Sequence, residues 1–125
     1  MKLTVDARGA ANYVRAYTAD GFRIGQREYA GSVIVSADAL VENWRPRSMD
    51  ELAFADLEPA LALSPEVLLI GGGARQTLPD PGLLADLYRS RIGFELMTTG
   101  AACRTYNVML AEGRAVVAAL MPARS

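Results

Sequence analysis

The fold is decided by residues 98–113, which read TTGAACRTYNVMLAEG. Either Thr98 or Thr99 can accept a hydrogen bond from the first unpaired backbone N–H groups of a helix. Gly113 can take the left-handed conformation that closes the last helical turn. Between these ends, apolar side chains recur at helical spacing and share one face; they are Ala102, Tyr106, Met109 and Leu110. The segment therefore predicts a capped helix that is mostly buried.

The segments around this helix predict alternating strands and helices. Residues 66–70 form a continuous apolar run, typical of a strand covered on both faces, and the run leads into Gly71-Gly72-Gly73. Asp80-Pro81 predicts a helix start, with the helix extending to about Ser90. Residues 94–97 and 115–121 predict two further strands. Since connections across a helix usually make adjacent strands parallel, we expect 66–70 and 94–97 to be parallel neighbours.

The first third of the chain shows strand-like alternation in residues 13–17, 22–26 and 29–35. This pattern predicts a three-stranded antiparallel β-meander. Further on, Ser48 and Glu51 match a capping box. A helix begun there and carried to Leu63 would hold Pro59 in its interior, at a cost of about 3 kcal/mol. We therefore expect the helix at residues 57–63, with Asp56 as its cap.

These elements predict a single domain, residues 1–125, of the α/β class. The expected architecture is a three-layer sandwich with a mixed central sheet. Helices cover one face of that sheet, and the N-terminal antiparallel β-meander extends or covers it.

Composition limits the function. The chain has no His and one Cys, which excludes Ser-His-Asp and Cys-His catalysis and predicts no metal site. We also expect no cofactor. A formal net charge of −1 disfavours nucleic acid as a partner. No segment approaches the roughly 20 apolar residues of a membrane span. The single Cys and the absence of a signal peptide predict a cytoplasmic, bacterial protein.

The candidate ligand site lies where two parallel strands are expected to end. In open α/β sheets such ends form the usual binding crevice. There the glycine run Gly71, Gly72 and Gly73 should meet Thr98 and Thr99 at the positive end of the helix dipole, and Arg75 could add charge. A small anion fits this chemistry, although an ordinary capped helix end is the commoner explanation. A nucleotide site is not predicted, because residues 74–79 separate the glycines from the next helix.

A second candidate group lies on the helix of residues 98–113, where Gly100, Arg104 and Asn107 form a narrow stripe beside the apolar face. Arg104 and Asn107 could bind a ligand or a partner, or could satisfy the ends of neighbouring strands. We favour the last role for Asn107 and leave Arg104 open. Cys103, at the edge of the stripe, is interpreted as a core group and not a nucleophile.

The same stretch carries a resemblance to a known family. Residues 97–107 and the following Glu112-Gly113-Arg114, together with residues 69–73, Gly31-Ser32 and Trp44, resemble domain of unknown function 498. That family includes the mitochondrial complex I assembly factor 3 and an adipogenesis-associated protein. The resemblance implies a three-layer α/β sandwich, no established enzymatic activity, and a chaperone-like role for the mitochondrial member. Its glycine motif often has a polar residue between the glycines, where this chain has Gly72.

Two functions remain open from the sequence. The first is a non-catalytic interaction or assembly-factor-like module that binds a protein partner. The second is a small-molecule or anion-binding protein, or an enzyme, that uses the crevice described above. The sequence leaves the partner, the ligand and the oligomeric state open.

Overall fold

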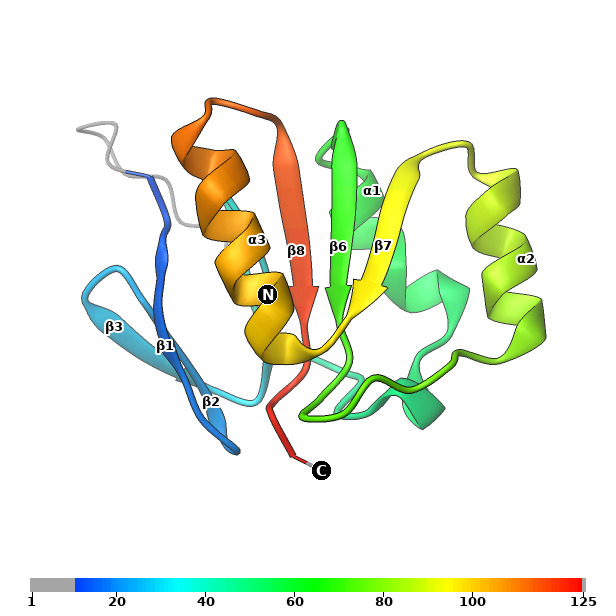
Figure 1. Ribbon diagram of the computed structural model, residues 1–125, viewed down its shortest axis with the longest axis horizontal. Coiled ribbons are helices and arrows are strands. Elements are labelled where there is room, and N and C mark those ends of the chain that lie inside the picture. The colour runs from blue at the N-terminus through cyan, green and yellow to red at the C-terminus, as the bar shows by residue number, and fades with distance from the viewer. Residues whose placement is uncertain (1–10, 125) are drawn as a thin grey trace.

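The computed structural model describes residues 11–124, which form a mixed α/β fold in three layers (Figure 1). The middle layer is a five-stranded sheet in the order β5-β4-β8-β6-β7. Its strands are β4 (Ser32–Ser36), β5 (Leu40–Trp44), β6 (Val67–Gly71), β7 (Gly93–Met97) and β8 (Val116–Leu120). The predicted α/β class and mixed central sheet are therefore confirmed.

Strand β6 lies at the centre of the parallel part of the sheet. It pairs in parallel with both β7 and β8, so that Leu69 lies opposite Glu95 on one side and Ala118 on the other. The expected parallel pairing of the two apolar strands is confirmed. The carboxyl ends of β6, β7 and β8 consequently meet at one edge of the sheet, the lower edge in Figure 1.

Helix α3 (Thr99–Ala111) covers one face of the sheet and has the predicted caps. Thr98 is the capping residue, and its hydroxyl oxygen accepts a hydrogen bond from the Ala101 N–H at 3.3 Å. Gly113 follows the helix with φ 77°. The predicted apolar face is buried at Ala102, Tyr106 and Leu110 and half-buried at Met109.

The N-terminal part is a small antiparallel sheet of β1 (Val14–Tyr17), β2 (Gly21–Ile24) and β3 (Arg27–Ala30), packed beside α3 (Figure 1). A three-stranded meander is present, but its expected third strand, residues 29–35, is divided. The chain turns at Gly31, with φ 80°, and then enters the large sheet as β4. The β5 strand was not predicted. The first hydrophobic core lies between this small sheet, α3 and the large sheet.

The opposite face of the large sheet carries the remaining helical segments, so the expectation of helices on one face only was wrong. These segments are the 3₁₀ turns η1 (Met49–Glu51) and η2 (Phe54–Leu57) and the helices α1 (Glu58–Leu61) and α2 (Pro81–Arg89). They bury a second core, which includes Ile34, Leu57, Leu68, Ile70 and Leu87. Two cores form because each central strand is apolar on both faces.

The start of α2 agrees with the sequence. The helix expected at residues 57–63 is present but shorter, as α1, and Asp56 is not its cap. The Asp80 carboxylate accepts a hydrogen bond from Gly82 N–H at 2.9 Å, as expected for its cap. Asp56 instead lies inside η2, where it reaches back to the Ala53 N–H at 2.9 Å. The helical path therefore begins as a 3₁₀ turn at Phe54, and α1 is only four residues long.

Candidate functional site

The glycine loop and the start of α3 come together at the carboxyl edge of the sheet, as the sequence predicted. Thr99 joins them, because its hydroxyl accepts from Gly73 N–H at 2.8 Å and donates to the Met121 carbonyl at 2.6 Å. The Thr99 N–H also donates to the Gly73 carbonyl at 2.8 Å. These polar groups of Thr99 are therefore used by the chain itself.

Gly71 allows this close approach, because it has no side chain. A methyl group added there would lie 3.0 Å from the Ala102 methyl carbon and 3.1 Å from the Thr99 Cα. Gly73 has φ 120°, a conformation that favours glycine, and lies close to the Arg124 carbonyl. That carbonyl accepts a hydrogen bond from Ala74 N–H at 3.0 Å. The crevice expected at the strand ends is thus filled by the C-terminal segment.

A hollow of about 420 Å³ remains just outside this closed junction. Gly72 and Arg75 line it. The other charged residues of its lining are the basic Arg47 and Arg124 and the acidic Asp50 and Glu51. Two of the eight sequence-predicted site residues, Gly72 and Arg75, therefore share one hollow.

The charges in this hollow are not equally available. The Arg124 guanidinium pairs with Asp20 at 2.8 Å. Glu51 accepts a hydrogen bond from the Arg47 backbone N–H at 2.8 Å. Within residues 11–124, the exposed Arg75 side chain has neither an ion pair nor a hydrogen bond. The exposed Arg47 guanidinium likewise has no partner among these residues, so Arg75 and Arg47 are the two available cations of the hollow.

Asn107 holds the small sheet against α3. Its amide nitrogen donates to the Val14 carbonyl at 2.9 Å, and its amide oxygen accepts from the Val14 N–H at 3.0 Å. The side-chain amide thus makes the same pair of hydrogen bonds with Val14 that a neighbouring strand would make. This geometry agrees with the structural role that the sequence favoured for Asn107.

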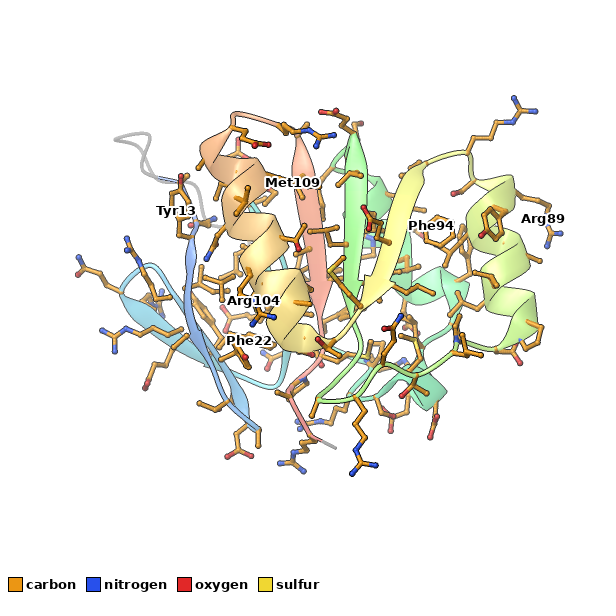
Figure 2. The ribbon with its side chains drawn as sticks, in the orientation of Figure 1. Tyr13, Phe22, Arg89, Phe94, Arg104 and Met109 are labelled. Atoms are coloured by element: carbon orange, nitrogen blue, oxygen red, sulfur yellow. The ribbon has the colours of Figure 1, made fainter. Side chains whose placement is uncertain are left out.

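Arg104 is exposed on α3, one turn before Asn107 (Figure 2). The space left by Gly100 is taken by Tyr17, since a methyl group added to Gly100 would lie 2.4 Å from the Tyr17 hydroxyl. Cys103 is buried, and burial raises the pKa of its thiol to about 12, against a smaller opposing effect of the Arg104 charge. A thiol held protonated is a poor nucleophile.

Sequence reasoning missed the residues that fill and surround the crevice. Met49 places its methyl group where a side chain at Gly72 would have to lie, 2.6 Å from that Cβ position. Arg124 supplies both a carbonyl and a side chain at the same edge. Arg124 could have been predicted from the sequence, because it follows β8, and the carboxyl ends of parallel strands lie at the same edge of a sheet. Met49 carries no such signal.

Two features are absent from residues 11–124. That part of the chain contains no cluster of three or more His, Cys, Asp or Glu suited to a metal ion. It also has no helix with both the length and the apolar character needed to cross a bilayer.

A curated relative resembles this chain over most of its length. It is NADH dehydrogenase [ubiquinone] 1 alpha subcomplex assembly factor 3 from Xenopus tropicalis, which is 30% identical over 112 residues. The alignment covers 88% of this chain but 61% of the relative, so the chain spans about three fifths of that protein.

Solved bacterial structures share the fold. A protein from Bordetella parapertussis is 37% identical with a TM-score of 0.81, covering 90% of this chain and 97% of that one. A protein from Bartonella henselae, described as an outer membrane protein, is 34% identical with a TM-score of 0.79, covering 91% and 97%. Since the family profile matches residues 14–121, the chain belongs to the family described as protein of unknown function (DUF498/DUF598).

Proposed function

We propose that this chain is a non-catalytic interaction module that helps a protein complex to assemble. One observation carries the proposal: the crevice where α/β folds usually bind small ligands is filled by the chain's own groups. There the Thr99 hydroxyl accepts a hydrogen bond from the Gly73 N–H and donates one to the Met121 carbonyl. Because the crevice is closed, the outer surface of the fold is what remains for contacts with other proteins.

The comparison with the assembly factor supports the same proposal. The name of that relative describes a role in building a larger complex, and the aligned region includes most of this chain. The remainder of that protein lies outside the aligned region, so its particular partner is not carried over. We propose only the class of function, which is binding a protein during assembly.

A deletion experiment tests this function in the native cell. Membrane and soluble complexes from wild-type, deletion and complemented strains are separated on native gels and quantified by mass spectrometry. We expect at least one complex to fall in abundance on deletion and to recover on complementation. An unchanged set of complexes, with no reproducible partner after mild cross-linking and capture, would overturn the proposal.

The hollow beside Arg75 supports a second candidate function, binding of a small anion. Arg75 lacks an ion pair within residues 11–124, and Gly72 and Arg47 line the same space. A phosphate or carboxylate group would supply the missing partner.

A thermal-shift panel of phosphates and carboxylates tests this second candidate. A ligand at 100 times its dissociation constant adds about 2.7 kcal/mol to the free energy of unfolding. The shift should disappear in Arg75→Ala and persist in Arg15→Ala, which alters an exposed arginine of β1 that does not line this hollow. A flat panel with the wild-type chain rejects the candidate.

We further propose that the module acts in the cytoplasm, as its single cysteine suggests. The description of the Bartonella henselae protein as an outer membrane protein points to another location for that relative. Fractionation of the native cell, with markers for cytoplasm and outer membrane, decides between them. Recovery in the outer-membrane fraction would overturn the cytoplasmic location.

A further inference from the structure

The end of α2 and the start of β7 enclose a second surface feature, which we call the α2–β7 corner. It is a hollow of about 390 Å³ lined by Tyr88, Arg91, Ile92, Gly93 and Phe94. The rings of Tyr88 and Phe94 meet edge to face, with centroids 5.2 Å apart. Figure 2 shows Phe94 in the space between β7 and α2. Tyr88 is 68% exposed, so a large aromatic surface faces solvent beside the hollow.

The corner carries one uncompensated positive charge. Arg89 pairs with Asp86 on its own helix. Among the described residues, Arg91 has no ion pair and no side-chain hydrogen bond. The nearest acid along β7, Glu95, lies on the other face of the sheet: it is opposite Leu69 of the first core, whereas Phe94 is opposite Leu68 of the second.

Arg91 also has an unusual backbone. Its φ is 62°, directly after Ser90, the residue that ends α2. Glycine is the usual residue there, because a side chain in the left-handed conformation is strained. Strained residues concentrate at binding sites, so such an outlier motivates a functional hypothesis. Here the strained residue is also the one that supplies free charge to the hollow.

We infer that the α2–β7 corner binds a short acidic segment of a partner protein through one apolar side chain. The apolar side chain would pack against the exposed Tyr88 ring and Phe94, and a neighbouring carboxylate would pair with Arg91. Attraction to an anionic membrane needs several free cations, because each one contributes little. One free cation beside an aromatic hollow therefore favours a peptide. The inference rests on the proposed interaction function and specifies its partner.

Two synthetic peptides that differ only in charge test the inference. The probes are acetyl-Asp-Glu-Leu-Glu-Asp-amide and acetyl-Lys-Lys-Leu-Lys-Lys-amide, each titrated into the ¹⁵N-labelled full chain and followed by amide NMR shifts. We expect the acidic peptide to shift the amides of residues 88–94 and the basic peptide to leave them unchanged. Equal shifts with both peptides, shifts elsewhere, or none with either would overturn the inference.

Three variants sharpen the test. Tyr88→Ala should abolish the shifts, whereas Val108→Ala, another exposed apolar residue but on α3, should leave them intact. Arg91→Gly should weaken the acidic peptide about fivefold, the scale of one exposed ion pair. The same variant should raise the melting temperature, because it relieves the left-handed strain. A variant that gains stability and keeps full binding would show that Arg91 takes no part.

The deletion strain separates this inference from the proposed function. If wild-type chain restores the affected complex and the Tyr88→Ala chain restores it equally well, the corner is not the docking site, although the assembly function stands. If deletion affects no complex, the assembly function fails whatever the peptides show. Loss of complementation by Tyr88→Ala, with an unchanged melting temperature, supports both.

Discussion

Asn107 joins two segments 93 positions apart, because its side-chain amide pairs with both backbone groups of Val14. Its neighbour Tyr106 adds a second link, since the Tyr106 hydroxyl donates to the Asn12 carbonyl at 2.8 Å. Arg104, one turn earlier on α3, is exposed and makes no such link within residues 11–124. At the residue scale, the polar stripe of α3 therefore divides into a structural part and a surface part.

Alanine substitutions separate these two parts. Asn107→Ala should lower the free energy of unfolding by about 1–3 kcal/mol, because the Val14 N–H and carbonyl lose their partner. Arg104→Ala should change it by less than about 0.5 kcal/mol, as expected for an exposed residue. Urea unfolding of both variants measures the difference. A similar large loss in both would mean that Arg104 is structural as well.

Cys103 should be inert in the folded protein. Burial raises the pKa of its thiol to about 12, so the thiolate is scarce at neutral pH, and the side chain is also shielded from reagents. Labelling by an aromatic disulfide reagent at pH 8 should be slow in buffer and rapid in urea, where the chain is unfolded. Fast stoichiometric labelling in buffer would contradict the core assignment.

At the element scale, Asp56 organises the turns between β5 and α1. Its carboxylate accepts from the Ala53 N–H and pairs with Arg45 at 2.6 Å, while its carbonyl accepts from the Trp44 indole N–H at 2.8 Å. The hydrogen bond from Arg45, more than any other interaction, holds the pKa of Asp56 below its usual range. One residue thus fixes η2 against the end of β5.

This depressed pKa makes stability depend on pH. Because the folded chain binds the Asp56 proton less readily than the unfolded chain, the carboxylate stabilises the fold at neutral pH. That contribution decreases as the pH falls below about 4 and through the folded pKa. Asp56→Asn should therefore be less stable than wild type at pH 7, by up to about 1 kcal/mol, and the difference should shrink at pH 3. Asp50→Asn, an exposed acid in η1, is the control. A difference that stays constant from pH 7 to pH 3 would refute the linkage.

At the scale of the whole molecule, β6 lies between the two hydrophobic cores and contributes side chains to both of them. Leu69 faces the first core with α3, whereas Leu68 and Ile70 face the second with α1 and α2. Ile70 is fully buried between β7 and β8. Damage to β6 therefore reaches both sides of the sheet.

Ile70→Asp should prevent folding. An unpaired carboxylate buried there costs several kcal/mol, comparable with the 5–15 kcal/mol that stabilises a typical domain. Leu78→Asp is a matched control, since Leu78 is 85% exposed and should tolerate the same change. Circular dichroism and thermal unfolding give the readout. A cooperatively melting Ile70→Asp protein would show that β6 is not central.

Local signals in the sequence determined several elements of this protein. Thr98 and Gly113 mark the two ends of α3, Asp80 caps the start of α2, and an apolar run forms the central strand β6. These predictions hold because capping and periodicity depend on residues a few positions apart. The same logic brought Gly72 and Arg75 to the carboxyl edge of the sheet, where they line one hollow.

Tertiary structure decided the rest, because the deciding contacts join distant residues. The alternating run of residues 29–35 is divided between two sheets by the turn at Gly31. Before the turn, β3 pairs with β2, and after it, β4 pairs with β8. The crevice is closed by the Met121 carbonyl, 22 positions from Thr99, and no local pattern predicts that contact. Strand pairing and the closing of the crevice depend on how much apolar surface distant segments bury against one another. Those contacts form only when the whole chain has collapsed.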